Sequence, residues 1–509
     1  MSRDNPRHPK GIHAMKRLFA AFLALALLLP ALMTSCSEKN PEEAPEQSAA
    51  PVSADIPGSE PAEEEEETRP PHNLPEMDFG GASFRISAFD GSNSVPTLQP
   101  EELNGEAVND AIYNRNTLLT ETYDFVFDTV PYGTDYGAHT REISTMVRAG
   151  DDAYEMIYGH VVGTCNNAIN GDYMNLYELP YIDFGAVWWP AQSVDEMTVF
   201  GRMFTITGSA TYSQLAAAKV VFFNKDLTAQ YGLEEPYGLV RSGDWTIDAL
   251  IGTTKDIYQD TNGNGERDPS DLYGYGTGPM QNGFFVSTNT PILSRTEDGG
   301  KEITVMTDRT VALVEKLYSW YYESGSVYLK MDVAGETGYA TEFASGHTVF
   351  SFGHINHASS YYRASDISYG ILPQPKYDSE QESYIAFACP SLFSVPITCQ
   401  NTELAGFVFE AMTYYGYFDV IPVYYGTTLK GKVADSPDDI EMLEIVNDAL
   451  TVSFAYCYDN WEGFAHFLSG TVMNFTETGG NSDVASIYAK RNKIAQKRLE
   501  KCLKAFRGE

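Results

Sequence analysis

Apolar and polar positions repeat along the chain with two periods. Period two is typical of half-buried strands, and apolar residues three and four apart are typical of amphipathic helices. In the first half of the chain, strands are predicted over 84–89, 125–127 and 154–158, and helices over 105–123 and 140–149. Strands that alternate with helices indicate a parallel α/β sheet. Ligands of such sheets bind beyond the carboxyl ends of the strands, which makes Asp90 and His160 candidate ligand-binding residues.

The rest of the chain has a more mixed pattern. Strands are predicted over 220–224, 348–352 and 369–373, and helices over 226–231, 245–258, 308–322, 402–415, 439–450 and 482–506. Thr246 is expected to cap the second of these helices, and Trp245 to pack at its start. The last helix is basic and amphipathic. No internal repeat is present.

The start of the chain carries a targeting pattern. A basic group at 15–17 precedes an apolar run over 18–32, which is too short to favour a stable membrane span. The small residues before Cys36 resemble the lipobox of bacterial lipoproteins. That resemblance implies cleavage before Cys36, lipidation of its thiol and a membrane-anchored, extracytoplasmic protein. Ordinary signal-peptide cleavage with a bystander cysteine is the alternative, and Met15 is an alternative start.

Residues 37–77 are rich in Glu, Pro, Ala and Ser and include five glutamates in a row at 63–67. Such a segment has little apolar surface to bury, so we expect a disordered, extended tether. The alternative is that this acidic segment is an interaction tail that binds a partner.

Composition limits the range of functions. About 430 residues remain after the signal and tether, which favours two lobes over one core. The formal net charge of −36 argues against nucleic acid or anionic lipid as a partner. It also argues against general attraction of an anionic substrate, although a local basic pocket could override that. Of six cysteines, five remain if Cys36 is lipidated, so at least one is a free thiol. Cys389 and Cys399 flank a short strand-turn region, and both a pair and two free thiols are open there.

Several segments, in their order, carry a family resemblance. They are 110–116 with 123–125, 221–225 with 231–233 and 243–246, 370–377 (Gly-Ile-Leu-Pro-Gln-Pro-Lys-Tyr), and 420–425 with 429–430 and 442–443. Together they resemble the extracellular solute-binding proteins of bacterial ABC transporters, in the large family that includes carbohydrate binders. The segment 370–377 is the most specific, because a Gly-x-x-Pro-x-Pro-Lys stretch typically marks a return between lobes.

This resemblance implies an α/β, periplasmic-binding-protein-like fold of class II, with two lobes joined by a hinge and the ligand cleft between them. We expect lobe 1 over 78–195 and 366–425, and lobe 2 with the C-terminal helices over 196–365 and 426–509. The implied partners are a carbohydrate, most simply an oligosaccharide, and the permease subunits of an ABC importer. We expect a monomer.

Sugar recognition suggests further candidates. Aromatic rings cover the apolar faces of sugars, while polar side chains bond the hydroxyls. The chain contains 33 Tyr, 27 Phe and 5 Trp. The ligand-binding candidates from this reasoning are Trp188, Trp189, Tyr212, His354, Asn356 and Trp461, with His357 beside them. For the tryptophans the alternative is core packing, and for the histidines it is a hydrogen-bonded loop.

Residues 260–271 match a calcium-loop pattern. The candidate ligands are Asp260, Asn262, Asn264, Glu266, Asp268 and Asp271, with glycine at the sixth position. Asp271 departs from the usual glutamate at the twelfth position. The sequence is compatible both with a structural Ca²⁺ site and with a metal-free turn. We expect no other cofactor.

The sequence contains none of the common catalytic motifs. No Gly-x-Ser-x-Gly, His-Glu-x-x-His or phosphate-binding glycine loop is present. A glycosidase pair of carboxylates is not excluded by counting. We therefore expect a binding protein rather than an enzyme, with a cell-surface hydrolase and a glycan-capture lipoprotein without a transporter as the alternatives.

Overall fold

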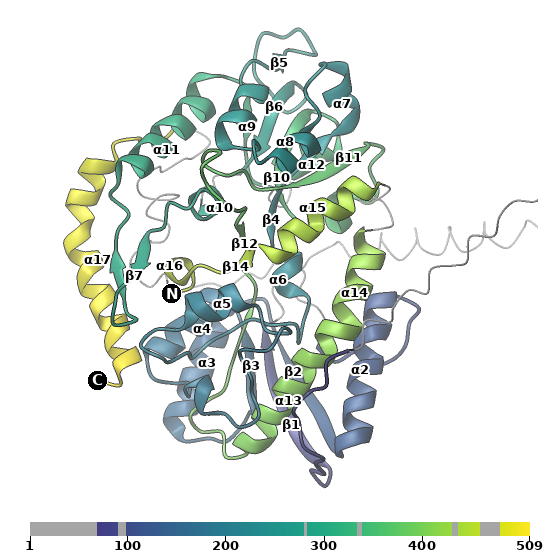
Figure 1. Cartoon of the computed structure of the whole chain (residues 1–509), viewed down its shortest axis with the longest axis vertical. Helices are drawn as coiled ribbons and strands as arrows, with labels where there is room; N and C mark the ends of the chain where they lie inside the picture. The colour runs from purple at the N-terminus through teal and green to yellow at the C-terminus, as the bar shows by residue number, and fades with distance from the viewer. Residues whose placement is uncertain (1–68, 90–97, 279–281, 333–337, 430–435, 459–478) are drawn as a thin grey trace, which may run out of the picture. The chain divides into compact units, whose positions relative to one another are not determined.

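The computed structural model describes residues 69–89, 98–278, 282–332, 338–429, 436–458 and 479–509. The predicted signal peptide, Cys36, most of the predicted tether, Asp90 and Trp461 lie outside these ranges. Within them, no helix is both long and apolar enough to cross a bilayer. The body that follows residue 68 is one compact unit with two main sheets (Figure 1).

Lobe 1 is built on a four-stranded sheet in the order β13-β3-β1-β2. Its strands are β1 (Ala82–Phe89), β2 (Phe125–Gly133), β3 (Met156–Gly159) and β13 (Leu392–Ser394). The first three are parallel, as predicted, and β13 joins β3 antiparallel. The apolar positions of β1 point into the core, where Phe84 and Ile86 are fully buried. Three parallel strands therefore end at one edge of this sheet.

Lobe 2 is built on a six-stranded sheet in the order β11-β4-β10-β6-β5, with β9 beside β6. Its strands are β4 (Lys219–Asn224), β5 (Tyr258–Gln259), β6 (Leu272–Thr277), β9 (Val327–Leu329), β10 (Thr348–His354) and β11 (Tyr369–Pro373). Strand β4 runs antiparallel to β10 and β11. The first residue of β4 therefore lies at the same edge as the last residues of β10 and β11.

Apart from the segments that join the lobes, the remaining described elements are mostly helices, with one short pair of strands, β7 and β8. They are α2 (Ala107–Tyr123), α3 (Tyr136–Ala149), α4 (Val161–Ile169), η1 (Leu176–Glu178), α5 (Ala191–Met197), α6 (Ser213–Ala216), α7 (Lys225–Gln230), α8 (Pro236–Ser242), α9 (Ile247–Thr254), α10 (Asn282–Ser287), β7 (Leu293–Arg295), β8 (Lys301–Ile303), α11 (Asp308–Tyr318), η2 (Ser319–Glu323), α12 (Tyr339–Ala344), η3 (Ala358–Tyr362), α13 (Thr402–Tyr415), η4 (Gly416–Val420), α14 (Ile421–Tyr424), η5 (Tyr425–Leu429), α15 (Pro437–Asp448), α16 (Phe454–Cys457) and α17 (Val484–Arg507).

Two helix predictions need correction. The helix predicted over 245–258 is α9, which ends at Thr254, because Tyr258 pairs with Tyr273 as a strand. Thr246 does cap α9, accepting a hydrogen bond from the N–H of Ala249, and Trp245 is buried at its start. The helix predicted over 308–322 is α-helical only as far as Tyr318 and continues as a π-helical turn.

Three crossing segments join the lobes side by side. Ala218, just before β4, forms a bridge with Ala388. Strand β12 (Ala386–Phe387) pairs with β14 (Leu450–Thr451), and Ala388 donates its N–H to the carbonyl of Thr451 at 2.9 Å. Figure 1 shows β12 and β14 between the two sheets. These segments form the hinge that the sequence predicted.

The predicted lobe boundaries at 196 and 366 are wrong. Ile206 still bridges to Phe393 in lobe 1, so the first crossing lies beyond it. Strand β11, placed in lobe 1 by the prediction, pairs with β4 because its apolar residues are buried against that strand. Helix α15 packs on β11 of lobe 2, whereas α17, which the prediction assigned to lobe 2, packs on α4 of lobe 1.

The end of the predicted tether is ordered. The Arg69 guanidinium lies 4.4 Å from the ring centre of Tyr414 and 4.7 Å from that of Tyr415. It also forms a salt bridge of 3.0 Å with Asp419. Cation–π contacts and a charged pair together hold this segment against α13 and η4. The folded body therefore begins at Arg69 rather than at residue 78.

Cys389 and Cys399, which the sequence left open as a pair, are not joined. All five cysteines within the described ranges are free thiols, and four of them are buried. Burial raises the pKa of the Cys399 thiol to about 12. The fold therefore stands on packing and backbone hydrogen bonds, without a cross-link among these residues.

Candidate functional site

The carboxyl edge of the lobe 1 sheet carries a cluster of rings. Tyr136 and His160 are stacked with centroids 4.2 Å apart and an interplanar angle of 21°. Phe89, the last residue of β1, meets His160 edge-on at 5.6 Å. Tyr136 is 47% exposed, so one aromatic face at this edge is open to a ligand.

Two histidines of this cluster are held in place by the backbone and by a hydroxyl. His160 caps α4, its Nδ1 accepting the N–H of Val162 at 3.3 Å. His139 Nε2 lies 2.9 Å from the hydroxyl of Ser87. Burial lowers the pKa of His139 to about 4 and also lowers the pKa of His160. Both rings are therefore neutral near pH 7 and can serve as hydrogen-bonding and stacking groups rather than charges.

The matching edge of lobe 2 is also rich in rings. His354, the last residue of β10, lies 5.1 Å from His357, and His357 lies 5.0 Å from Tyr361 between ring centres. Tyr361 is 38% exposed. Burial lowers the pKa of His357 to about 4 and holds that of His354 well below its usual range, with the charges of His357 and Lys219 adding to the shift. Asn356 is buried between these histidines.

Lys219 and Gln374 lie at the same edge, next to the hinge. The Nζ of Lys219 stands 4.2 Å from the ring centre of Phe387 in β12, and burial lowers its pKa. Gln374 follows β11 and is only 1% exposed, yet neither atom of its amide has a hydrogen-bond partner in the described part of the chain. A Cβ on Gly283 would come within 2.8 Å of the Gln374 amide. Gly283 thus allows α10 to approach this amide closely.

Trp188 and Trp189 are placed elsewhere. Both are buried in lobe 1, and their indole N–H groups each donate to one carboxylate oxygen of Glu410 at 2.8 Å. Burial raises the pKa of Glu410 to about 7, although the two indoles oppose that shift. This arrangement favours core packing, the alternative that the sequence left open for the two tryptophans.

Of the other candidates, Tyr212 stacks on Tyr424 at 4.3 Å in lobe 1 and is half-buried. The structure therefore brings His354 and Asn356 together at the edge of the lobe 2 sheet. It places His160 at the carboxyl edge of the lobe 1 sheet. Trp188 and Trp189 are instead buried against Glu410, whereas Tyr212 lies next to Tyr158 near the carboxyl end of β3. Asp90 and Trp461 lie outside the described ranges.

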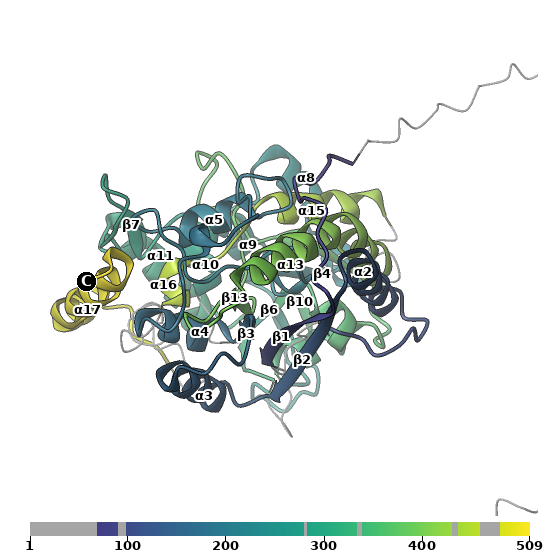
Figure 2. The ribbon, with the colours of Figure 1, turned by 90° about the horizontal axis from the view of Figure 1, so that it is seen from below.

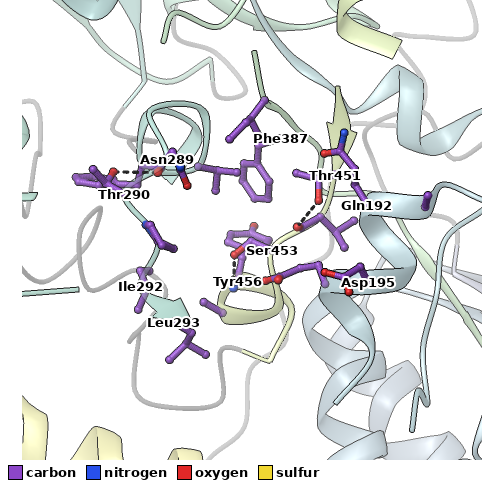
Figure 3. Close-up of a pocket in the computed structure, with 18 residues that line it drawn as sticks. Gln192, Asp195, Asn289, Thr290, Ile292, Leu293, Phe387, Thr451, Ser453 and Tyr456 are labelled. Carbon is purple, nitrogen blue, oxygen red and sulfur yellow. Dashed lines mark hydrogen bonds between the residues drawn. The ribbon is translucent and has the colours of Figure 1, made fainter. Parts of the chain in front are cut away.

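A cavity of about 510 Å³ lies beside the hinge (Figure 3). Its walls come from α5 of lobe 1, from α10 and the loop after it in lobe 2, and from β12, β14 and α16. Phe387, Tyr456, Ile292 and Leu293 give it apolar surface. Its acid Glu196 is paired with Lys301 at 2.6 Å and accepts the N–H of Phe454. None of the residues predicted from the sequence lines this cavity.

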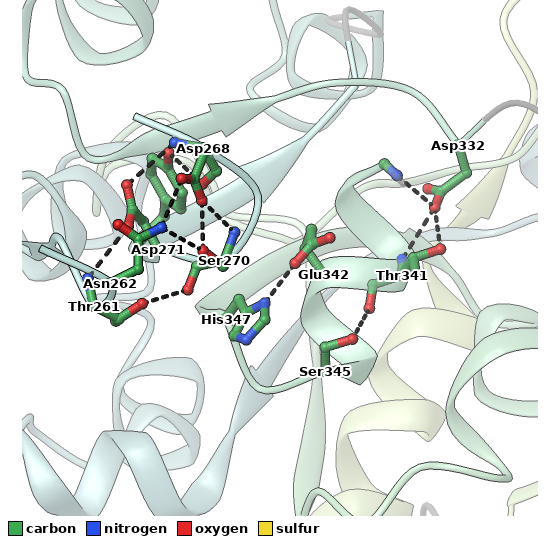
Figure 4. A network of polar contacts seen from close by, with 12 residues as sticks. Thr261, Asn262, Asp268, Ser270, Asp271, Asp332, Thr341, Glu342, Ser345 and His347 are labelled. Atoms are coloured by element: carbon green, nitrogen blue, oxygen red, sulfur yellow. Dashed lines mark hydrogen bonds and ion pairs between the residues drawn. The ribbon is translucent and has the colours of Figure 1, made fainter. Parts of the chain in front are cut away.

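The loop 260–271 is folded around its own side chains (Figure 4). Asp268 accepts the side-chain amides of Asn262 and Asn264 at 2.7 Å each, and hydrogen bonds from these and from Ser270 lower its pKa to about 2. Gly265, the sixth residue, has a φ of 75°. The oxygens of Asp271 instead accept from the Thr261 N–H and the Tyr258 hydroxyl.

Three side chains of this loop thus converge on one point. Directing the Oδ1 atoms of Asn262 and Asn264 to this point, beside an oxygen of Asp268, would require them to leave or share the N–H groups of Asn264 and Glu266, which they accept at 2.9 and 2.7 Å. With that change the residues would fit a hard cation at these positions. Asp271 does not suit a cation ligand, because its carboxylate already accepts hydrogen bonds that join the two ends of the loop.

One further group of potential metal ligands is present in the described residues. It consists of Asp152, Glu155 and Cys399. Arg85 pairs with both carboxylates and donates its backbone N–H to Glu155 at 2.7 Å. A cation there would have to displace the guanidinium, so this group is a salt-bridge cluster.

Several residues at the two edges escaped the sequence analysis. They are Tyr136, His139, Lys219, Tyr361 and Gln374. Lys219 carried a usable signal, since it is a charge at the start of an otherwise apolar strand. Tyr136 and Tyr361 are two of 33 tyrosines and carried none.

No family model and no curated protein sequence matches the chain. Solved structures share its architecture. An ABC substrate-binding protein of Listeria monocytogenes, in complex with cycloalternan, superimposes with a TM-score of 0.52 at 12% identity, over 82% of this chain and 99% of that one. The GacH receptor of Streptomyces glaucescens, solved unliganded and with acarbose, gives 0.52 at 14% identity over 82% and 99%.

The chain has the fold of ABC substrate-binding proteins. UgpB of Mycobacterium tuberculosis, in complex with glycerophosphocholine, extends this likeness at a TM-score of 0.52 and 14% identity, over 83% of this chain and 99% of that one. The predicted class II α/β fold of two hinged lobes is confirmed. In this fold the edges described above belong to the two lobes that the hinge connects.

Proposed function

We propose that this chain is an extracytoplasmic solute-binding protein that captures a carbohydrate and delivers it to an ABC importer. The observation that carries the proposal is the pair of ring-bearing sheet edges, one on each lobe of a substrate-binding fold. Tyr136 with His160 supplies such an edge on lobe 1, and His357 with Tyr361 supplies one on lobe 2. Ligands of open α/β sheets bind at such edges.

The chemistry of these edges suits a sugar. Half-exposed rings can cover the apolar face of a pyranose, and neutral imidazoles can donate to or accept from its hydroxyls. The two lobes together would present rings on both sides of a ligand. That arrangement favours an oligosaccharide over a small polar solute, and this choice is part of the proposal.

The alternative of a hydrolase receives less support. Asp332, the carboxylate whose charge acts on His357 and Tyr361, accepts N–H groups from Gly338, Ala340 and Thr341. A carboxylate held in this way orders a loop and is poorly placed to act as an acid or base. A retaining or inverting glycosidase needs two facing carboxylates.

The likenesses to solved structures support the sugar class. Two of the proteins that share the fold were solved with cycloalternan or acarbose. UgpB, by contrast, was solved with glycerophosphocholine, so the fold accepts other solutes. The ligand class of this chain therefore has to be measured.

A thermal-shift screen of sugars, oligosaccharides and peptides tests the proposal. A specific ligand raises the melting temperature by mass action. An oligosaccharide that does so without being cleaved supports a receptor. A rise with peptides alone, or turnover of a glycan, contradicts it.

We also propose anchoring at Cys36. The substitution Cys36→Ala should release the protein from the membrane without changing its affinity for sugar. Loss of sugar affinity in that variant would contradict a role confined to attachment.

Finally, we propose a structural Ca²⁺ site in the loop 260–271. Asp260, Asn262, Asn264 and Asp268 would hold the ion, with Glu266 offering its carbonyl, and the ion would supply charge that braces lobe 2. Asp271 and its shorter side chain would stabilise the loop from outside the shell.

A further inference from the structure

The C-terminal helix α17 differs in charge from the rest of the chain. It carries eight of the 34 lysine and arginine residues and one acid, Glu500, in a chain whose net charge is −36. In both views it lies at the margin of the body (Figures 1 and 2). It packs on α4 through one buried face formed by Val484, Ala495, Leu499, Cys502, Leu503 and Phe506.

Five lysines occupy the opposite face. Lys490, Lys493, Lys497, Lys501 and Lys504 are all exposed. Their spacing of three or four residues keeps them on one side of an α-helix. At about 1.5 Å per residue this lysine stripe is roughly 21 Å long. Ile494, 48% exposed, lies within it and adds an apolar side chain.

The lysine stripe is not neutralised by its own helix or by its neighbours. In the described part of the chain none of the five lysines forms an ion pair, and the pair within α17 joins Arg507 to Glu500 at 3.0 Å. Five like charges without counter-charges raise the free energy of the helix slightly. Such a stripe on an otherwise acidic body therefore indicates a surface for an anionic partner.

We propose that the lysine stripe of α17 docks on an anionic lipid bilayer. Lysines near a membrane surface contribute on the order of 1 kcal/mol each, and a planar array of headgroups matches a straight stripe. The net charge of the whole chain argues against anionic lipid, but the lysine stripe concentrates five positive charges on one face of α17. Attraction of this face would orient the body with α17 toward the bilayer.

The inference rests on the proposed attachment at Cys36 and is independent of the ligand. Between Cys36 and Arg69 lie 32 residues, which extend to at most about 110 Å. Attachment at Cys36 therefore permits α17 to reach the surface. Attachment at Cys36 would hold the body close to the membrane, and the lysine stripe would add a second contact that fixes its orientation.

The test uses the lipidated full-length protein in vesicles. Vesicles of phosphatidylcholine alone are compared with vesicles of phosphatidylcholine and phosphatidylglycerol in equal amounts. Lysines are acetylated with a membrane-impermeant reagent and quantified by mass spectrometry. We expect acetylation of the lysine stripe to be on the order of tenfold slower on the anionic vesicles, and the difference to vanish in high salt. The exposed Lys255 of lobe 2 serves as an internal control and should not change.

Two variants sharpen the result. Replacing the five lysines by glutamine should reduce energy transfer from tryptophan to a dansyl headgroup to the level seen on neutral vesicles. Replacing them by arginine should preserve it, because the charge remains. Both changes leave the buried face of α17 intact.

Equal acetylation on both vesicles would overturn the proposal, as would loss of energy transfer in the arginine variant. Protection by a soluble glycerophosphate polymer but not by anionic vesicles would overturn it in favour of an envelope polymer. Failure of lipidation is distinguishable, because the protein would then not float with either vesicle. Sugar affinity would be unchanged in every case.

Discussion

Glu410 accepts the indole N–H of Trp189 at 2.8 Å inside lobe 1. Its other carboxylate oxygen accepts the indole N–H of Trp188. The carboxylate is 2% exposed, and no ion pair joins it to a described cation. Two neutral donors therefore compensate a buried acid whose pKa burial raises to about 7.

This arrangement predicts a pH dependence of stability. The folded protein binds a proton at Glu410 more tightly than the unfolded chain does, since the pKa rises from 4.5 to about 7. The contribution of Glu410 to the free energy of unfolding should therefore fall as pH rises from about 4.5 to about 7, by about 3 kcal/mol, and level off above. Urea unfolding across this pH range measures it.

The substitution Glu410→Gln isolates the effect. The variant should lose this part of the pH dependence, and its stability should be lower because the amide NH2 of glutamine faces one indole N–H as a second donor. The control is Glu403→Gln. Glu403 lies on the same helix but at the surface, where it accepts a hydrogen bond from the hydroxyl of Tyr181, so this variant should keep the pH dependence of the original protein. An unchanged pH profile in Glu410→Gln would show that the carboxyl titrates normally.

Ligand affinity should depend on Tyr136. Tyr136→Ala removes the exposed half of the stacked pair with His160, and we expect a dissociation constant about tenfold weaker for the sugar found by screening. Tyr177→Ala, a similarly exposed tyrosine in lobe 1 that bonds to Thr198, should bind normally. Calorimetry distinguishes the two, and equal affinities would remove Tyr136 from the site.

Two helical glycines should respond in opposite ways to alanine. Gly283→Ala should destabilise the protein by about 1–3 kcal/mol, because the added methyl meets Gln374 and Lys219. Gly252→Ala in α9 should stabilise it by about 0.5–1 kcal/mol, since nothing lies within 4 Å of the new Cβ. Denaturant midpoints at constant m-value measure both, and the same sign for both would contradict the close packing at Gln374.

Removal of calcium should lower stability if the loop 260–271 binds it. The melting temperature should rise by a few degrees between chelator and excess Ca²⁺, by mass action. Asp268→Asn should abolish the rise. Asp298→Asn, another exposed turn aspartate that accepts a backbone N–H from Gly300, should retain it. A rise that survives Asp268→Asn would place the ion elsewhere.

The sheets could be predicted from the sequence because their signal is local. The period-two stretch at 84–89 and the apolar run at 220–224 each predict a strand without help from distant residues, and both strands are present with bounds that differ by at most two residues. The order of the strands in each sheet, by contrast, could not be predicted from local sequence. Nothing near β11 indicates that it pairs with β4, so the lobe boundary at 366 was placed too early.

The site could be predicted only where strand ends mark it. His160 and His354 were found because each follows or ends a recognisable strand. Trp188 and Trp189 were chosen for their chemistry, yet a glutamate more than 200 residues away in sequence determines their environment. Stacking of Tyr136 on His160 likewise depends on two loops that only the folded sheet brings together.

The contact of Arg69 with Tyr414 and Asp419 has a mechanical consequence. It makes lobe 1 the point at which the preceding segment is attached to the body. Any pull on that segment would reach the body through α13 and η4. Bending at the hinge would then move lobe 2 relative to this attachment point without straining the contact of Arg69.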